Sequence, residues 1–209
     1  MSAANCQRRR AWAILLFLGA LAAAGAGAFA HDPVSEPPFQ GAADAPITLV
    51  QYGDYQCAFC ALFNREVKPL IAERFIEAGA VRFEFRHFPW IGAASRRAAH
   101  AAYCAHAQGS FWPYHDYLYG PGGGALSSEE LIAAAELLEL DVDAFAHCLD
   151  DPAFAQRVEE EFRAARHARI LTTPTFVVNG ERLIAGARPY EFWEELFTRL
   201  LAELEGAAP

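Results

Sequence analysis

Two cysteines stand at the point where a predicted strand leads into a predicted helix. Residues 47–52 form a short, mostly apolar run, a turn follows, and Cys57-Ala58-Phe59-Cys60 comes next. Apolar side chains then recur at helical spacing as far as Phe75. The N-terminus of a helix presents unpaired N–H groups and a positive potential, which stabilise a thiolate on the first cysteine. The pattern therefore predicts a strand–helix junction that carries a reactive dithiol.

The same cysteine spacing also occurs in zinc sites, and such a pair can be an inert structural disulfide. Zinc would need two further ligands, but Cys104 and Cys148 lie far from this motif and from each other, without a second C-x-x-C. The strand–helix context favours a redox-active pair over both alternatives. We expect no metal and no cofactor at this site.

The first thirty residues have the composition of an export signal. Three arginines at residues 8–10 precede an uncharged stretch over residues 11–30, and Ala28-Phe29-Ala30 matches a signal-peptidase site. We expect a signal peptide over residues 1–30 and His31 as the first mature residue; an uncleaved membrane anchor is the alternative. The predicted location is the periplasm or another extracytoplasmic compartment, with a membrane tether if the segment is retained.

The acidic balance of the chain argues against nucleic acid as a partner. The 209 residues carry a formal net charge of −9, and no basic cluster follows residue 10. With 54% hydrophobic and 21% charged residues, the chain has the composition and the length of a globular protein with a core of its own.

The rest of the chain divides into strand, helices and strands again. Residues 81–86 alternate apolar and charged side chains, which is typical of a strand with one buried face. Residues 93–170 are predicted to be mainly helical, with a capping box at Ser127 and a helix cap at Asp143. Asn179-Gly180 lies between two further strand patterns and predicts a hairpin with a type I′ turn. A last amphipathic helix follows the hairpin.

Thr173-Pro174 stands directly before the first strand of this hairpin. Taken alone the pair says little, because X-Pro often begins a strand and most X-Pro bonds are trans. Together with the C-x-x-C motif and the order β-α-β, helices, β-β-α, it makes the sequence resemble the thioredoxin superfamily, and specifically the DsbA-like oxidoreductases. The resemblance covers about residues 45–205 and rests on four segments: Gly53-Asp54-Tyr55-Gln56-Cys57-Ala58-Phe59-Cys60, Arg86-His87-Phe88-Pro89, Gln108-Gly109-Ser110-Phe111-Trp112 and Thr173-Pro174-Thr175-Phe176-Val177-Val178-Asn179-Gly180.

The resemblance implies an α/β thioredoxin fold with an inserted all-helical domain. Residues 46–92 and 171–209 would form the thioredoxin-fold domain, and residues 93–170 the helical insertion. Residues 31–45 contain several Pro and Gly residues without periodicity and would be a linker before the fold.

The resemblance also implies roles for four residues. Cys57 would be the exposed sulfur of low pKa that forms a mixed disulfide with substrate, and Cys60 the buried partner that leaves or resolves it. Pro174 would be a cis-proline beside the pair, so that the Thr173 backbone can pair with a bound substrate strand. The expected activity is the introduction of disulfides into unfolded or reduced exported proteins, with a membrane quinone-linked partner accepting the electrons.

Two residues depart from the pattern of many relatives and leave the direction of electron flow open. Phe59 stands where a His often stabilises the thiolate, and Gln51 stands where a buried acid often accepts a proton; Asp54 is the nearest acid. We therefore expect a less depressed pKa for Cys57, and a less oxidising couple, than in the strongest oxidants of the family. A disulfide reductase or isomerase on the same fold, or a peptide-binding chaperone without turnover, are the alternatives.

Cys104 and Cys148 fall in predicted helices of the insertion. Two buried free thiols are one interpretation, because cysteine packs as a small hydrophobe. Since export favours paired cysteines and some relatives have paired cysteines in this region, we expect a structural Cys104–Cys148 disulfide. A second redox relay through the same pair is a further alternative.

Overall fold

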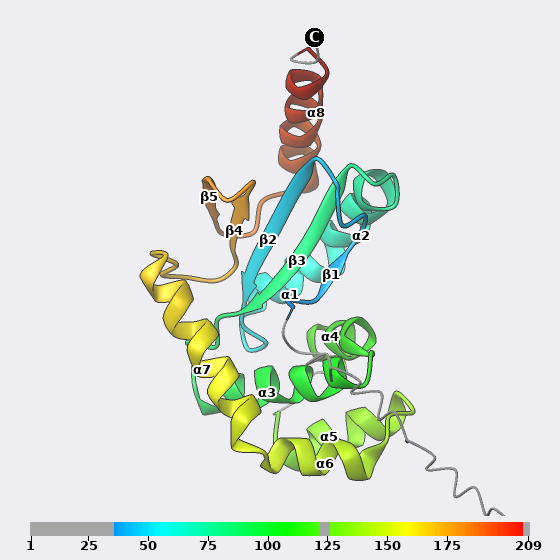
Figure 1. The fold of residues 1–209 in the computed structure, drawn as a ribbon, viewed down its shortest axis with the longest axis vertical. Helices are drawn as coiled ribbons and strands as arrows, with labels where there is room; N and C mark the ends of the chain where they lie inside the picture. The colour runs from blue at the N-terminus through cyan, green and yellow to red at the C-terminus, as the bar shows by residue number, and fades with distance from the viewer. Residues whose placement is uncertain (1–35, 122–125, 207–209) are drawn as a thin grey trace, which may run out of the picture. The chain divides into compact units, whose positions relative to one another are not determined.

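The computed structural model describes residues 36–121 and 126–206, and five strands in these ranges form one mixed sheet (Figure 1). The strands are β1 (Phe39–Gln40), β2 (Ile47–Gly53), β3 (Val81–His87), β4 (Thr175–Val178) and β5 (Arg182–Ala185), in the order β1-β3-β2-β4-β5. β2 and β3 are parallel, whereas the other neighbours pair antiparallel. A helix connects β2 to β3, and the β4–β5 hairpin follows the insertion. The predicted thioredoxin fold is confirmed.

The predicted signal peptide and the first residues of the predicted linker lie outside the described ranges. Among the described residues, no helix combines the length and the apolar character needed to span a bilayer.

The strand β1 lies inside the range predicted to be a linker. Phe39 pairs with Glu84 of β3, its ring lies 4.0 Å from the Arg82 guanidinium, and its carbonyl accepts the Trp112 indole N–H at 3.0 Å. The prediction of a linker over residues 31–45 is therefore wrong at residues 39 and 40. A strand of two residues is too short to produce an alternating pattern, which explains why the sequence did not indicate it.

The helix between β2 and β3 changes its hydrogen-bond pattern along its length. It begins as α1 (Ala58–Leu62) and continues through a π-helical segment (Phe63–Val67), α2 (Lys68–Ile71) and a second π-helical segment (Ala72–Ile76). Pro69 lies in the first turn of α2, between the two π segments. π turns inside helices occur frequently at functional sites, and the first one here begins at Phe63, three residues after Cys60.

The helices of the insertion lie beyond the carboxyl ends of β2 and β3 (Figure 1). They are α3 (Ala93–Ala107), α4 (Phe111–Tyr119), α5 (Ser128–Leu137), α6 (Val142–Asp150) and α7 (Pro152–His167). The predicted capping box of Ser127 and Glu130 is confirmed at the start of α5. The predicted cap at Asp143 is wrong, because Asp141 precedes α6 and its carboxylate accepts the Ala144 N–H at 2.9 Å.

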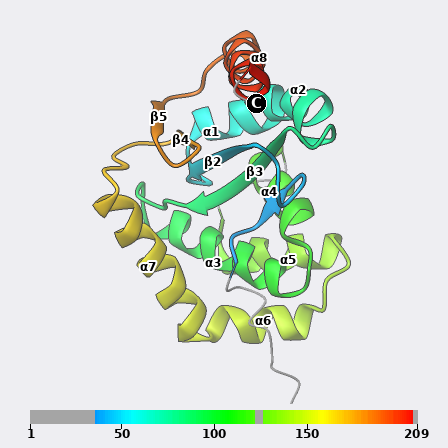
Figure 2. The same ribbon diagram turned by 45° about the horizontal axis from the view of Figure 1, so that its top comes forward.

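Two apolar clusters meet at the helix that follows β2. The last helix, α8 (Tyr190–Gly206), lies on the same side of the sheet as α1 and α2 (Figure 2), and its Trp193 packs on Phe63 and Phe176. The second cluster lies in the insertion and includes Cys57 and Cys60 among its members. The insertion therefore buries the cysteine pair from one side, while the thioredoxin core supports its helix from the other.

The β4–β5 hairpin turns at Asn179 and Gly180. Both residues have positive φ, 52° and 72°, and the Glu181 N–H donates to the Val178 carbonyl at 3.2 Å. Two successive positive φ values define a type I′ turn, so the predicted turn is confirmed. β4 begins at Thr175, directly after Pro174, and its pairing with β5 fixes the position of that segment.

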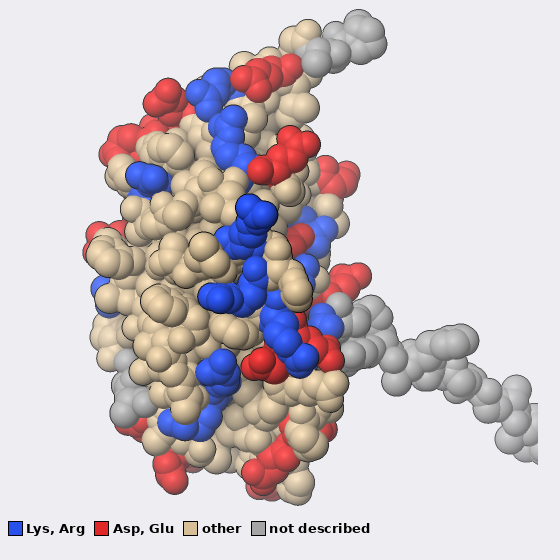
Figure 3. Space-filling model, turned by 90° about the vertical axis from the view of Figure 1, so that its left-hand side faces the viewer, with Lys and Arg blue, Asp and Glu red and all other residues tan. Residues whose placement is uncertain are grey.

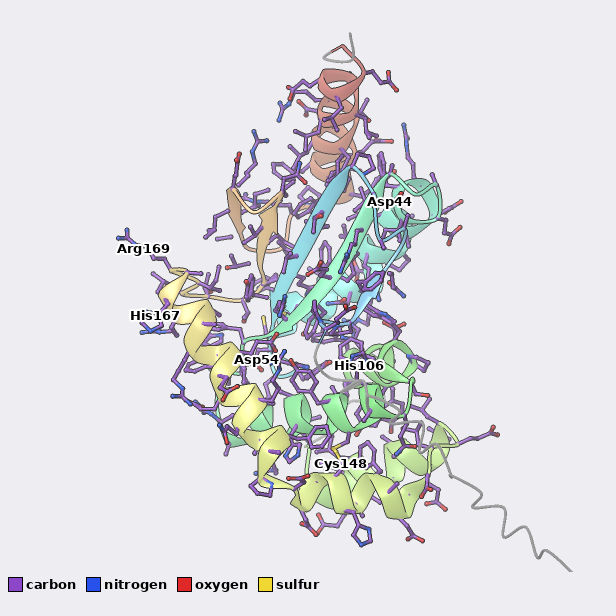
Figure 4. The ribbon with its side chains drawn as sticks, in the orientation of Figure 1. Asp44, Asp54, His106, Cys148, His167 and Arg169 are labelled. Atoms are coloured by element: carbon purple, nitrogen blue, oxygen red, sulfur yellow. A yellow bond between two sulfur atoms is a disulfide. The ribbon has the colours of Figure 1, made fainter. Side chains whose placement is uncertain are left out.

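A disulfide joins Cys104 of α3 to Cys148 of α6 in the structure (Figure 4). The two Cα atoms are 5.7 Å apart, and 44 positions separate the residues in the sequence. His100 Nε2–H donates to the Cys148 carbonyl at 2.9 Å, which adds a second link between the same helices.

Removing this disulfide should destabilise the protein. For a closed loop of 44 residues, the chain-entropy relation gives a loss of about 4 kcal/mol in the free energy of unfolding. We expect a loss of this size in the Cys104→Ala/Cys148→Ala variant, measured by urea unfolding in a Cys57→Ser/Cys60→Ser background. In that background a reductant should destabilise only the protein that retains Cys104 and Cys148; equal stability with and without the pair would contradict the prediction.

Candidate active site

Cys57 is the residue that begins the helix. It is the N-cap of α1, with φ −79° and ψ 110°, and its Sγ accepts the Cys60 N–H at 3.3 Å. Its side chain takes the place that Ser or Asp often occupies at this position, where an acceptor satisfies one of the unpaired N–H groups of the first turn. Both Cys57 and Cys60 are free thiols in the structure, with relative exposures of 7% and 0%. The sulfur expected to be exposed is thus largely covered.

The surroundings of Cys57 lower its pKa to about 6. The largest cause is the hydrogen bond from the Cys60 thiol, which stabilises the thiolate. Burial acts in the opposite direction, while the Thr173 side chain and the backbone N–H groups of Phe59 and Cys60 lower the pKa further. Cys57 is therefore mainly a thiolate at neutral pH, and the thiolate is the nucleophile in disulfide exchange.

Cys60 behaves in the opposite way. Its burial raises the pKa of the thiol well above the ordinary range, and the hydrogen bond to Cys57 raises it further because Cys60 is the donor. One thiol of the pair is thus ionised and the other protonated. Because of this difference, Cys57 can act as the nucleophile in disulfide exchange, while Cys60 stays protonated until it resolves the mixed disulfide.

The Thr173-Pro174 segment lies against Cys57. The peptide bond between Thr173 and Pro174 is cis, and Cys57 Sγ is 3.4 Å from the Thr173 carbonyl oxygen. The sequence thus brings together Cys57, Cys60, Thr173 and Pro174, whereas Cys104 and Cys148 lie apart in the insertion.

Trp90 is a member of the site that the sequence reasoning missed. Its indole N–H donates to Thr173 Oγ1 at 2.9 Å. The Thr173 oxygen accepts this hydrogen bond from Trp90. The Thr173 hydroxyl can therefore still donate its own proton to the Cys57 sulfur. Trp90 follows directly on the Arg86-His87-Phe88-Pro89 segment, and its place beside a motif segment was the one signal in the sequence.

Asp54 holds the turn before Cys57. Its two carboxylate oxygens accept the N–H groups of Gln56 at 2.8 Å and Ile91 at 3.0 Å, and Figure 4 places it at the end of β2. Gln51, in the middle of β2, is fully buried between Phe85 and Phe176. The sheet therefore presents the neutral amide of Gln51 at this position, and both oxygens of Asp54 are engaged with backbone.

A buried chain of hydrogen bonds ends on the Cys60 carbonyl. Asn64 Nδ2 donates to this oxygen at 2.9 Å, so Asn64 Oδ1 must accept the Nε2–H of His115 at 3.1 Å. His115 Nδ1 in turn accepts the Tyr55 hydroxyl at 3.1 Å. Burial holds the pKa of His115 well below its usual range, so the ring stays neutral and the direction of the chain is fixed. The sequence reasoning missed this network, although a His inside an aromatic run was a signal for it.

One group of potential metal ligands occurs among the described residues, and it lies away from the C-x-x-C pair. It consists of His100, Cys104 and Cys148. The two sulfurs are joined in the disulfide and cannot bind a metal as thiolates.

Comparison with known proteins decides the family. The profile of the family described as "Thioredoxin" matches residues 34–197. The chain belongs to the thioredoxin family. Disulfide bond formation protein D of Bacillus subtilis is 30% identical over 178 residues, which cover 81% of this chain and 78% of that protein. The predicted resemblance to DsbA-like oxidoreductases is confirmed.

Solved structures of this part of the thioredoxin family have the same fold. The oxidised form of BdbD from Bacillus subtilis has a TM-score of 0.72 and 29% identity, covering 79% of this chain and 93% of that one. Alpha-DsbA1 of Wolbachia pipientis has a TM-score of 0.72 and 22% identity, covering 81% and 92%.

The thioredoxin-family region also resembles parts of much longer proteins. The Na(+)/H(+) antiporter NhaA 1 of Salinispora arenicola is 36% identical over 145 residues, but these are only 22% of its length. For that antiporter the match is thus a minor portion of the protein.

The indole of Trp90 should support the low pKa of Cys57. In Trp90→Phe the Thr173 hydroxyl loses its donor and is free to turn away from the sulfur, so the pKa should rise by roughly half a unit to one unit, or about 1 kcal/mol. The pKa is measured from the thiolate absorbance of the reduced protein as a function of pH. Trp112→Phe, which also removes an indole donor but one that binds Phe39, is the matched control and should leave the pKa unchanged. Equal shifts in both variants would exclude a specific role for Trp90.

Proposed function

We propose that the chain is a thiol:disulfide oxidoreductase that donates its Cys57–Cys60 disulfide to reduced proteins. The observation that carries this proposal is the pair of unlike thiols, Cys57 with a pKa of about 6 and Cys60 with a raised pKa, beside a cis-proline. The membership of the thioredoxin family and the relation to disulfide bond formation protein D support it.

The proposed reaction has two exchange steps. A substrate thiolate attacks Cys57 Sγ of the disulfide, the Cys57–Cys60 bond breaks, and Cys60 leaves with the bonding electrons and takes up a proton. A second substrate thiolate then attacks the substrate sulfur of the mixed disulfide and expels Cys57 as a thiolate. The substrate loses two electrons and gains a disulfide, and the protein keeps both electrons as the dithiol.

The pKa of Cys57 supports this direction in spite of Phe59 and Gln51. First cysteines with pKa values of about 7 and about 3.5 belong to couples near −270 and −120 mV, and a value of about 6 lies between the two. Structural disulfides of secreted proteins form below about −300 mV, so donation to them is favourable from either end of that range. Because a pKa of about 6 is nearer to the less oxidising couple, a reductase is the second candidate.

The surface near Pro174 suits an unfolded polypeptide as the substrate. Phe59, Trp90 and Leu171 are exposed large apolar side chains, and Phe59 reaches a relative exposure of 65%. The face of α7 and the β4–β5 hairpin shows wide uncharged areas between its Lys and Arg side chains (Figure 3). An extended substrate would pair with the Thr173 backbone and place apolar side chains on these residues, with little dependence on sequence.

The proposed site of action is outside the cytoplasm. The export signal predicted over residues 1–30 and the relation to disulfide bond formation protein D support this location. The substrates would be newly exported proteins, and a membrane quinone-linked protein would return Cys57 and Cys60 to the disulfide.

Replacing each cysteine separately tests the proposed roles. Cys57→Ser should abolish disulfide formation in reduced, denatured ribonuclease A, measured as recovered ribonuclease activity. Cys60→Ser, incubated with scrambled ribonuclease that contains disulfides, should instead accumulate a mixed disulfide: the Cys57 thiolate attacks a substrate disulfide and expels one substrate thiolate, and the Cys60 thiol that would resolve the adduct is missing. Mass spectrometry detects the adduct. Residual oxidation by Cys57→Ser would contradict the assignment, and faster reduction of insulin than oxidation of ribonuclease by the wild-type protein would support the reductase.

The pH dependence of the reduction potential follows from the two pKa shifts. Above pH 6, reduction of the disulfide takes up one proton, because Cys57 remains ionised while Cys60 is protonated. Below pH 6 it takes up two. The potential should therefore fall by about 30 mV per pH unit above pH 6 and by about 59 mV per unit below it. Equilibration with glutathione between pH 4.5 and 8 measures both slopes, and a single steep slope over the whole range would show that Cys57 has an ordinary pKa.

A further inference from the structure

A cavity of about 370 Å³ lies between the helix that carries the cysteines and α4. Residues on both sides line it, among them Asn64, Arg65, Lys68, Ala72, Asp116 and Tyr119. Gln40 of β1 and Pro69 complete the lining, and neither Thr173 nor Pro174 belongs to it.

Two lining residues reach from this cavity to the cysteine pair. Asn64 donates to the Cys60 carbonyl. Tyr119 packs in the same apolar cluster as Cys57 and Cys60. Its hydroxyl oxygen lies next to the Cα of Gly53, at the end of β2. A Cβ at Gly53 would lie only 2.7 Å from that oxygen, so the glycine leaves room for the hydroxyl. Tyr119 and Asn64 thus border the cavity and also belong to the surroundings of the cysteine pair.

The Tyr119 hydroxyl is buried and has no protein hydrogen-bond partner among residues 36–121 and 126–206. Buried polar atoms without protein partners are generally hydrated. Because the Tyr119 ring borders a cavity large enough for several waters, a water at its hydroxyl would connect with solvent in that cavity.

The chemistry at Cys60 requires such a connection. Cys60 is fully buried, yet its sulfur must take up a proton when the disulfide is reduced and lose one when the disulfide forms. The sheet beneath offers the neutral amide of Gln51, and both oxygens of Asp54 accept backbone N–H groups. Gln51, whose amide atoms also have no protein partner among the described residues, has no carboxyl group to exchange this proton, and the Asp54 carboxylate is engaged with backbone.

We propose that the cavity between α2 and α4 is the route by which protons reach and leave Cys60, with Tyr119 as the positioning residue at its inner end. This proposal rests on the proposed thiol–disulfide exchange. Tyr119 orients the innermost water of the route toward the sulfur, and it does not itself gain or lose charge, since burial raises the pKa of its phenol well above the usual range.

The Lys68–Asp116 ion pair connects this route with solvent. The Lys68 amine lies 3.0 Å from Asp116, and the relative exposures of the two side chains are 7% and 57%. Lys68 is thus buried in the cavity wall, whereas Asp116 lies at the protein surface. Burial lowers the pKa of Lys68, although Asp116 opposes the shift, so the ammonium can exchange protons with water more readily than an exposed lysine.

The proton and the electron pair are both accounted for in each turnover that uses this route. When an external thiolate attacks Cys57, the Cys57–Cys60 bond breaks and Cys60 leaves with the electron pair. One proton enters from bulk solvent through the cavity and binds the Cys60 sulfur. When the dithiol is oxidised, the same proton leaves by the same path, and the electrons go to the disulfide that acts as the oxidant.

The test is the rate at which a small dithiol reduces the Cys57–Cys60 disulfide, measured by rapid quenching and alkylation. In Tyr119→Phe this rate should fall roughly tenfold, less than the 10²-fold or more of a direct general acid, and its solvent deuterium isotope effect should exceed that of the wild-type protein. Tyr114→Phe is the matched control: Tyr114 is also buried on α4, but its hydroxyl donates to the Leu131 carbonyl. It should lose stability without a change in rate or isotope effect.

A second variant fills the cavity and leaves every hydrogen bond in place. Ala72→Leu should slow the same step and raise the isotope effect in the same way as Tyr119→Phe. If Tyr119→Phe and Ala72→Leu both match the wild-type rate and isotope effect, or if Tyr114→Phe shows the same loss, the route is wrong. If the wild-type protein itself fails to exchange disulfides, the proposed function fails instead, and the two failures remain distinguishable.

Discussion

The hydrogen bond from the Cys60 backbone N–H to the Cys57 sulfur is the interaction on which the site depends. It exists because Cys57 caps a helix whose first N–H groups have no backbone partner. The same geometry brings the Cys60 thiol to Cys57 as a second donor, and the pKa values of the two sulfurs separate. Without the strand–turn–helix placement, the motif would be two ordinary thiols.

Two sets of contacts hold this cap in position from opposite sides. On the sheet side, the cis bond before Pro174 brings Thr173 against Cys57, and Trp90 fixes the Thr173 hydroxyl. On the insertion side, His115 of α4 donates to Asn64 Oδ1, and Asn64, in the first π-helical segment, donates to the Cys60 carbonyl. The helical insertion therefore does more than cover the site, because a residue of α4 takes part in fixing the cysteine that must stay protonated.

The sequence predicted the parts of the fold that depend on local chemistry. The fold order, the capping box at Ser127 and the Asn179-Gly180 turn each follow from residues close together in the chain, and the structure has all three. β1 was missed because two residues make no pattern, and its place depends on contacts with Arg82 and Trp112 from distant segments. The cap of α6 is Asp141 and not the predicted Asp143, because aspartates stand at both positions and only the backbone geometry decides between them.

In the candidate site, too, the sequence predicted the residues that belong to local motifs and missed those that act through distant contacts. The motif and the family resemblance gave Cys57, Cys60, Thr173 and Pro174, but Trp90 and His115 act through contacts 83 and 51 positions away in the chain. A single sequence does not contain that information. Phe59 was expected to weaken the depression of the Cys57 pKa, and a value of about 6 lies above the lowest values of such cysteines, about 3.5.

The central claim is that Cys57 is ionised at neutral pH and Cys60 is not. The most direct measurement is the rate of iodoacetamide alkylation of each cysteine in the reduced protein between pH 4 and 9, with the modified residue identified by peptide mapping. We expect Cys57 alone to react at neutral pH, with a half-maximal rate near pH 6, while Cys60 stays unmodified until the protein unfolds. Alkylation of Cys60 first, or a half-maximal rate for Cys57 at the ordinary thiol value of about 8.5, would contradict the account.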